Sequence, residues 1–99
     1  MAYEIVFPSE RVEHEFEKAL HKTPADYQTE IAEAIRSLRD TPRPPGKRYK
    51  KLKGGVAVFH FTAQHRLRVG PYRIFYDLDD RHQKVTVLKL ARRDKHTYG

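Results

Sequence analysis

A proline-rich segment near the middle of the chain separates two halves with different secondary structure. Residues Thr41 to Gly46 read TPRPPG, with three prolines in four positions. Proline ends a helix because it lacks the amide hydrogen and clashes with the preceding turn. Apolar residues between positions 9 and 40 recur at helical spacing, whereas after the prolines they fall into strand-like segments. The sequence therefore predicts an α+β protein with its helices in the first half and most of its strands in the second.

The first half predicts a short strand followed by two helices. Residues Tyr3 to Phe7 are β-branched, aromatic or charged and stop at a proline, which indicates a strand. Ser9 is the predicted cap of the first helix, and Thr23, followed by Pro24, is the predicted cap of the second. Each helix carries one apolar stripe that we expect in the core: Val12, Phe16, Ala19 and Leu20 on the first, and Tyr27, Ile31, Ile35 and Leu38 on the second. The short link between them predicts an antiparallel helical hairpin.

The second half predicts a sheet. A basic run, Lys47 to Lys53, and a Gly-Gly pair come first. The predicted strands are Val56 to Phe61, Leu67 to Tyr76 with a bend at Gly70-Pro71, and Val85 to Leu90. The order is β-α-α followed by an antiparallel β-meander. We expect one small domain over residues 1–99, with the helical hairpin packed on one sheet face and the other face open.

The charge is divided as unevenly as the secondary structure. Up to Pro42 there are nine Asp/Glu against five Lys/Arg, a net charge of −4, and from Arg43 onward fifteen Lys/Arg against four Asp/Glu, a net charge of +11. A half this basic predicts a polyanion-binding face. Nucleic acid is the first candidate polyanion, before an anionic membrane or an acidic protein.

Composition excludes several other classes. The chain has no cysteine, which rules out disulfide scaffolds, thiolate zinc sites and cysteine nucleophiles. Its six histidines lack the spacing of metal ligands, so no metal site is expected. The longest apolar runs, of about six residues, fall short of the roughly 18 that span a bilayer, and no signal peptide is visible. We therefore expect a cytoplasmic protein without a membrane partner.

Strand alternation indicates which basic residues act together. Arg66 and Arg68 project to one side of their strand, and Leu67 and Val69 to the other. Continued through the bend, the alternation brings Arg73 to the open face with the first two arginines. A second polar group follows the last strand within seven residues: Arg92, Arg93, Lys95, His96 and Tyr98. Arginines on adjacent strands suit a phosphate, because the planar guanidinium can bond two oxygens at once.

These motifs, in this order, resemble the RelE/ParE superfamily of toxins from bacterial type II toxin–antitoxin systems. The resemblance is carried by RLRVGPYRIFY (Arg66 to Tyr76), by VTVLKLARRDKHTY (Val85 to Tyr98) and by the KxLKG-like element at Lys50 to Gly54. It covers nearly the whole chain. Resemblance to the RelE branch implies a RelE-like microbial ribonuclease fold and metal-independent, ribosome-dependent cleavage of mRNA that inhibits translation. It also implies a cognate antitoxin as partner, besides the ribosome and mRNA, and no small-molecule cofactor.

The same resemblance implies roles for the arginines of the middle strands. Arg66 and Arg68 match the basic residues that bind mRNA around the scissile phosphate. Arg73, in the aromatic-Arg pair, matches the residue that stabilises the transition state. Both roles are compatible with the chemistry of RNA cleavage, because charge builds on the phosphate oxygens while the 2′-OH attacks.

Residues near the C-terminus complete the implied site. Arg93, with Arg92 as the alternative register, matches an arginine near the leaving group, and Tyr98 matches a tyrosine that stacks on or activates the nucleotide. Tyrosine, with a pKa near 10, and arginine, above 12, are poor proton shuttles. His96 is therefore a further catalytic candidate, and Asp94 is expected to orient an arginine. The remaining predicted RNA contacts are Arg92, Lys95, Lys51 and Lys53.

Two other functions remain open. One is a ParE-like toxin that inhibits DNA gyrase without nuclease activity. That branch generally lacks the full set of basic and tyrosine residues, and this chain retains it. The other is a non-catalytic nucleic-acid-binding module in which Tyr72, Phe75 or Tyr98 stacks on bases.

Overall fold

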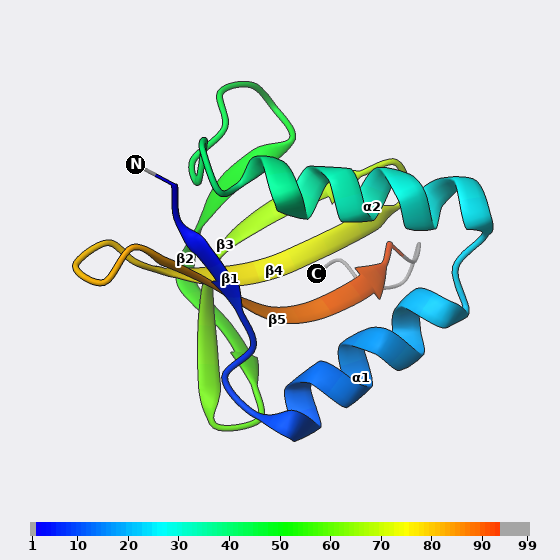
Figure 1. Ribbon diagram of the computed structural model, residues 1–99, viewed down its shortest axis with the longest axis horizontal. Helices are drawn as coiled ribbons and strands as arrows, with labels where there is room; N and C mark the ends of the chain where they lie inside the picture. The colour runs from blue at the N-terminus through cyan, green and yellow to red at the C-terminus, as the bar shows by residue number, and fades with distance from the viewer. Residues whose placement is uncertain (1, 94–99) are drawn as a thin grey trace.

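The computed structural model describes residues 2–93, which form a five-stranded sheet with two helices (Figure 1). The elements are β1 (Glu4–Val6), α1 (Glu10–His21), α2 (Ala25–Ser37), β2 (Tyr49–Val58), β3 (Phe61–Val69), β4 (Tyr72–Asp79) and β5 (Lys84–Arg92). The strand order is β1-β5-β4-β3-β2, and β2 to β5 form an antiparallel meander. The predicted α+β class and β-α-α order are confirmed. The sheet is not wholly antiparallel, because β1 pairs with β5 in parallel.

The two helices begin in different ways. The Ser9 hydroxyl accepts a hydrogen bond from the Val12 amide at 3.2 Å, as the sequence predicts for the cap of α1. The prediction that Thr23 caps α2 is wrong. Its hydroxyl donates instead to the Ala19 carbonyl at 3.0 Å and so satisfies the last turn of α1, while Pro24 occupies the cap position without a side-chain bond.

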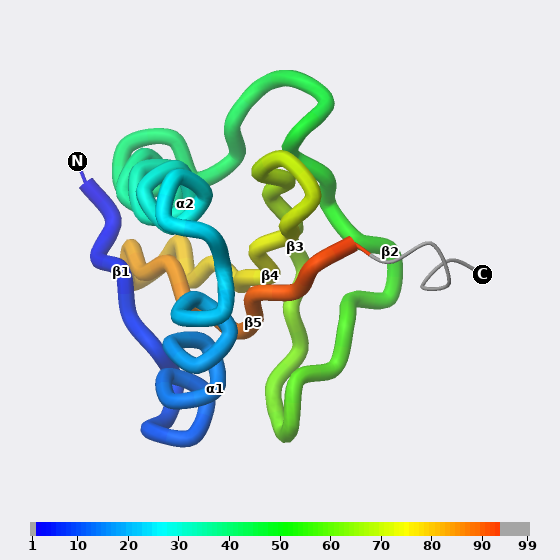
Figure 2. The backbone as a smooth tube through the Cα atoms, turned by 90° about the vertical axis from the view of Figure 1, so that its right-hand side faces the viewer, coloured from blue at the N-terminus to red at the C-terminus, as the bar shows by residue number. Residues whose placement is uncertain are grey.

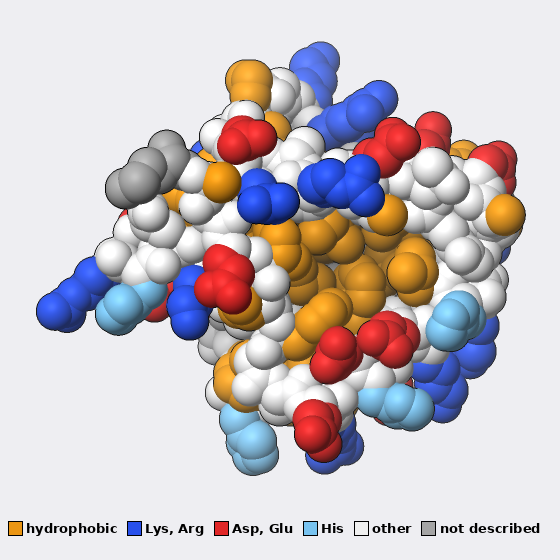
Figure 3. Space-filling view, viewed as in Figure 1, with side chains coloured by type: hydrophobic (Ala, Val, Ile, Leu, Met, Phe, Trp, Pro, Cys, Tyr) orange, Lys and Arg blue, Asp and Glu red, His pale blue; other side chains and the backbone are white. Residues whose placement is uncertain are grey.

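Both helices lie on the same side of the sheet, α1 against β5 and α2 against β3 (Figures 1 and 2). Their apolar stripes meet the helix-facing side chains of the strands in the main core, whose members include Phe16, Ile31, Leu38, Leu67, Val69, Tyr72, Ile74, Tyr76, Val85, Val87 and Leu90. Figure 3 shows apolar side chains that remain visible between the two helices. A second, smaller core cluster consists of Val12, Val58, Ala63 and Leu88.

The β2–β3 hairpin differs from the prediction. The predicted strand begins at Val56, after the basic run, whereas β2 already begins at Tyr49, inside that run. The segment Val56 to Phe61 is not one strand either. The chain reverses at Phe59 and His60, where Phe59 adopts a φ of 55° and the Arg11 guanidinium lies 4.1 Å from its ring centroid.

A wide bulge explains why the Gly-Gly pair lies inside β2. Lys51 pairs with His65, but the next paired residue is Val56, opposite Ala63, so positions 52–55 bulge out of the ladder. Gly55 has a φ of 72°, and a Cβ there would lie 2.4 Å from Thr62 Cγ2. Only glycine therefore fits this position.

A second bulge interrupts β5. Phe75 pairs with Lys89, but the next residue, Tyr76, pairs with Val87, so Leu88 is the extra residue. Leu88 is 3% exposed and belongs to the smaller cluster. The bulge changes which residues of the following part of β5 face the helices.

The proline-rich loop is fastened to the sheet by polar contacts. Arg43 makes a bidentate pair with Asp80, with N–O distances of 2.7 and 3.2 Å, and Tyr3 donates to the same carboxylate at 2.7 Å. The Arg43 hydrogen bond, followed by that of Tyr3, lowers the pKa of Asp80 to about 2. The Tyr76 hydroxyl donates to the Pro42 carbonyl at 2.8 Å. Neither helix of the described chain is long and apolar enough to cross a membrane.

Candidate nucleic-acid interface

Strand pairing aligns side chains from four strands in one row across the sheet. Lys50 of β2 lies opposite Arg66 of β3, Arg66 lies opposite Phe75 of β4, and Phe75 lies opposite Lys89 of β5. Directly paired residues point to the same side of a sheet, and neighbouring strands are about 4.8 Å apart. We call this set of four residues the cationic row. It places three cations and one aromatic ring on one face.

The row lies on the sheet face away from the main core. Along β4, Ile74 is fully buried, whereas its neighbours Arg73 and Phe75 are half-buried. Along β3, Leu67 is buried, whereas Arg66 and Arg68 are half-buried. The alternation predicted from the sequence for these two strands is therefore confirmed.

The row lines a cleft of about 570 Å³. Six of the ten residues that line it are basic and four are apolar: Lys50, Arg66, Arg73, Lys89, Arg92 and Arg93, and Leu52, Val56, Phe75 and Ala91. None of these ten described residues is acidic. Such a concentration of cations over an apolar floor fits a ligand with both phosphates and apolar groups.

The end of β5 distinguishes the two candidate arginines. Arg92 pairs with Tyr72, which belongs to the helix-side core, and also lines a small hollow beside the C-terminal end of α1. Ala91 pairs with Arg73, so Arg93, two residues further, continues the cleft side of the strand. The Arg93 amide donates to the Pro71 carbonyl at 2.6 Å. This register favours Arg93 over Arg92 as the partner of Arg73.

Other predicted contacts lie outside the cleft. Arg68 pairs with Arg73, yet it is not among the residues that line the cleft. Lys51 is exposed and pairs with the buried His65, so it points to the helix side. Lys53 lies exposed in the bulge of β2. The predicted residues Lys95, His96 and Tyr98, together with Asp94, lie outside the described residues.

Sequence reasoning missed Lys50 and Lys89. Lys50 belongs to the basic run, which was not assigned to a strand, although its alternation with Tyr49 and Lys51 would have placed it on one face. Lys89 follows the Leu88 bulge. Strict alternation from Val85 would have put it in the core, and no local signal announces the change of phase.

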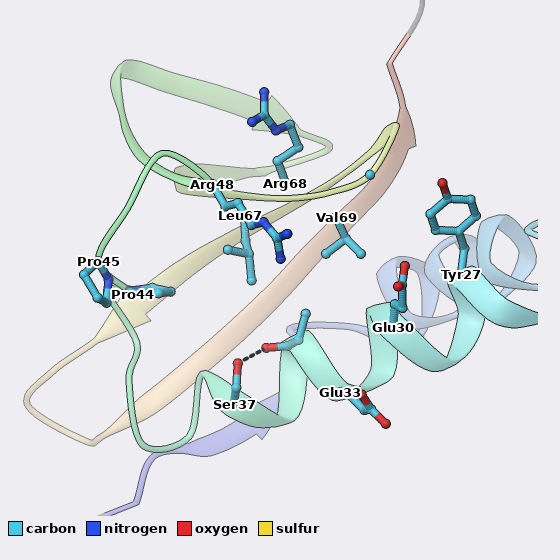
Figure 4. A pocket seen from close by; sticks show the side chains of 12 residues that line it. Tyr27, Glu30, Glu33, Ser37, Pro44, Pro45, Arg48, Leu67, Arg68 and Val69 are labelled. Carbon is cyan, nitrogen blue, oxygen red and sulfur yellow. Dashed lines mark hydrogen bonds between the residues drawn. The ribbon is translucent and has the colours of Figure 1, made fainter.

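Figure 4 shows a second and larger hollow, of about 630 Å³, between α2, the proline-rich loop and β3. Arg48, Leu67 and Val69 point toward α2, whereas Arg68 points away from it. The lining includes Glu30 and Glu33 besides the arginines. Because carboxylates would repel phosphates, this hollow is a poorer nucleic-acid site than the cleft.

His65 is a core residue. It is 4% exposed, its Nδ1 lies 2.7 Å from the Tyr49 hydroxyl, and its ring stacks on those of Tyr49 and Tyr76 with centroid distances of 5.8 and 5.3 Å. Burial lowers its pKa. Tyr72, one of the predicted stacking residues, is likewise buried, against Tyr27. Within residues 2–93, no three His, Asp or Glu side chains gather as metal ligands.

Three solved structures with a similar fold contain RelE or RelBE proteins. The RelE–RelB complex from Pyrococcus horikoshii matches with a TM-score of 0.72 and 24% identity over 96% of this chain and 99% of that chain. The RelBE2 toxin–antitoxin complex from Mycobacterium tuberculosis matches with a TM-score of 0.65 and 24% identity over 94% and 100%. A mutant of the E. coli toxin RelE in the free state matches with a TM-score of 0.60 and 22% identity over 98% and 88%. The fold is therefore that of the RelE-like toxins.

The family is shown by the sequence itself. A family model described as the ParE toxin of the type II toxin–antitoxin system parDE matches residues 6–96. The chain belongs to this ParE toxin family, within the RelE/ParE superfamily, and is a toxin of a type II toxin–antitoxin system. None of the curated proteins compared with the chain matches it in sequence.

Proposed function

We propose that this toxin is a metal-independent endoribonuclease that cleaves mRNA on the ribosome and so inhibits translation. The observation that carries the proposal is the cleft, in which six Lys/Arg side chains converge without a carboxylate among the described lining residues. RNA brings its own nucleophile, the 2′-OH, so the protein must chiefly bind the phosphates, stabilise the charge that develops and assist proton transfer. Cationic side chains in a cleft supply the first two of these functions.

Arg73 is the proposed stabiliser of the transition state. Arg73 of β4 lies opposite Arg68 of β3, and two residues further along β4, Phe75 lies opposite Arg66. The guanidinium groups of Arg66, Arg68 and Arg73 therefore belong to two adjacent rows of paired residues across the sheet. Arg93, just after the end of β5 and so on the other side of β4 from β3, lines the same cleft. Guanidinium groups on both sides of one phosphate can bind its non-bridging oxygens bidentately, and that binding strengthens as negative charge builds.

Proton transfer is assigned to the C-terminal residues. Arginine, with an ordinary pKa above 12, and lysine, with one near 10.4, are residue types poorly suited to proton transfer near neutral pH. Tyr98, which the family resemblance implies stacks on or activates the nucleotide, and His96, the histidine two positions before it in the sequence, are therefore the proposed participants in proton transfer. The catalysis proposed here depends mainly on positioning and electrostatic stabilisation and needs no cofactor.

A cognate antitoxin is the proposed regulator in the cytoplasm. The basic cleft suits an acidic segment, and the apolar side chains visible between α1 and α2 (Figure 3) suit the apolar face of an amphipathic one. The solved complexes with RelB and within RelBE2 support such a partner.

A ParE-like action is the second candidate, because the matching family model is that of the ParE toxin. In that case the toxin would bind DNA gyrase and the cleft would carry no catalysis. The full cationic row and Arg73 then have no role in chemistry, which gives the two candidates different consequences for the same variant.

One paired assay separates the candidates. Wild type, Arg73→Ala and a control, Arg81→Ala in the exposed β4–β5 turn, are tested for cleavage of ribosome-bound mRNA and for inhibition of gyrase supercoiling. We expect mRNA cleavage by wild type and the control, a loss of roughly 10²–10³-fold in single-turnover rate for Arg73→Ala, and no gyrase inhibition. Gyrase inhibition without cleavage by wild type would contradict the proposal and support the ParE-like action.

A further inference from the structure

Phe75 holds an unusual place in the cleft. It is the one aromatic residue among the ten described residues that line it, and its partners in the cationic row are Arg66 and Lys89. The cations therefore flank the ring on both sides along the row, at about one strand spacing each. The ring is half-buried and retains surface toward the cleft.

The surroundings of Phe75 extend this apolar surface. Leu52 and Val56 of β2 and Ala91 of β5 line the same cleft. Leu52 is the first residue of the bulge at positions 52–55, and Val56 follows the bulge. Gly55, the last bulged residue, has no room for a side chain beside Thr62. Among the cleft-lining residues of β2, Lys50 is thus cationic, and Leu52 and Val56 after it are apolar. A site that binds only phosphate needs no such floor.

We propose that Phe75 stacks on a nucleobase of the bound RNA while Arg66 and Lys89 bind the phosphates on either side. This inference rests on the proposed action on RNA and adds a base-binding position to that site. Aromatic rings stack on every base because every base has a π-face, so the position tolerates different sequences. The flanking cations hold the backbone, and the apolar floor excludes water around the base.

The competing role for Phe75 is packing. Its ring also contacts the smaller core cluster of Val12, Val58, Ala63 and Leu88. Phe61 packs against the same cluster but does not line the cleft. The variants Phe75→Leu and Phe61→Leu therefore make a matched pair, since both remove an aromatic ring from one cluster and only the first changes the cleft.

The test measures binding of the full chain to two probes by fluorescence anisotropy. One probe is a short single-stranded 2′-O-methyl oligoribonucleotide, which supplies no attacking hydroxyl, and the other is an abasic backbone of the same length. We expect wild type to bind the oligoribonucleotide more tightly than the abasic probe. Phe75→Leu should weaken oligoribonucleotide binding by about fivefold or more, the lower limit of a base–aromatic stack.

The controls separate stacking from packing. Phe75→Leu should leave abasic binding and the slope of log K against log salt unchanged, because no phosphate contact is lost. Phe75→Tyr should retain the preference for bases, and Phe61→Leu should retain wild-type binding. Thermal unfolding confirms that each variant is folded at the assay temperature.

Three results would overturn the inference. Equal binding of both probes by wild type, or an unchanged base preference in Phe75→Leu, would contradict stacking on Phe75. Cleavage of ribosome-bound mRNA by wild type would then still support the proposed function. Equal losses of oligoribonucleotide binding in Phe75→Leu and Phe61→Leu would show that Phe75 acts only through packing. If neither the oligoribonucleotide nor the abasic probe binds at low salt, and ribosome-bound mRNA is not cleaved, the proposed function is overturned as well.

Discussion

On β3 and β4, the side chains that face the helices and those that face the cleft alternate along the chain and have opposite chemistry. The helix side of these strands includes Leu67, Val69, Tyr72, Ile74 and Tyr76, all no more than 7% exposed. The cleft side includes Arg66, Arg68, Arg73 and Phe75, all half-buried. The helix side gains free energy by removing apolar surface from water, whereas cations directly opposite one another on the cleft side oppose folding. The same strands therefore provide stability on one face and a charged site on the other.

The largest expected effect separates these two faces at adjacent positions. Leu67→Ala should lower the free energy of unfolding by about 2–5 kcal/mol, because it leaves a cavity in the main core. Arg68→Ala, at the next residue, should change it by less than about 0.5 kcal/mol. Urea denaturation of both variants measures the difference. Similar losses in the two would mean that β3 is not divided into a stabilising and a charged face.

Gly70 joins the two strands and sets which of their residues share a face. Its φ is 57°, and a Cβ would lie 2.6 Å from Tyr27 Cε1. Gly70→Ala should therefore destabilise the protein by about 1–2 kcal/mol from the backbone alone, with an added steric cost. The control is the same change in a Tyr27→Ala background, where only the backbone cost should remain. Equal losses of unfolding free energy in both backgrounds would show that the contact with Tyr27 plays no part.

The two faces of β3 and β4 could be predicted because the alternation there is uninterrupted. The Gly70-Pro71 turn has two residues, so side chains on either side of it keep their phase, with Val69 opposite Tyr72. The apolar stripes of the helices depend on equally local spacing. These parts of the fold and of the site follow from periodicity alone.

The rest depends on pairing between distant segments. The bulge at Leu88 changes the phase of β5 and so concealed the position of Lys89. The bulge at positions 52–55 separates Lys50 from the predicted strand that begins at Val56, so Lys50 was not assigned to a strand. The parallel pairing of β1 with β5 joins residues about eighty positions apart and leaves no periodic trace in the sequence. Thr23 is a good capping residue by type, but the last turn of α1 takes its hydroxyl.

A smaller effect is expected where the faces meet on β2. Lys50 lies opposite Arg66, whereas Lys51 lies opposite His65. Lys50→Gln should raise the free energy of unfolding by about 0.2–1 kcal/mol at low salt, because it removes a like charge from a directly opposed pair. It should also reduce the salt slope of single-strand RNA binding by about 0.7. Denaturation and binding measured over a salt series provide both values.

Lys51→Gln is the matched control for that change. It removes the same charge from the adjacent residue on the other face. We therefore expect Lys51→Gln to change neither the free energy of unfolding nor the salt slope of RNA binding as Lys50→Gln does. If Lys51→Gln reduces the salt slope of RNA binding as much as Lys50→Gln does, the cleft does not define the binding face.

The last prediction uses pH to probe the helix side. Burial, followed by the charges of Arg43 and Lys51, lowers the pKa of His65 in the folded protein, although Asp77 and Asp80 oppose that shift. The unfolded chain, with a histidine pKa near 6.5, therefore takes up this proton first as the pH falls. The contribution of neutral His65 is fully present above pH 6.5 and is lost as the pH falls from there toward the folded pKa. Urea denaturation between pH 7.5 and 5 should show this loss in wild type and in His14→Gln, an exposed control on α1, and a smaller loss in His65→Phe. The same pH dependence in all three proteins would mean that His65 has the same pKa in the folded and the unfolded protein. Its side chain would then not be shielded from water on the helix side.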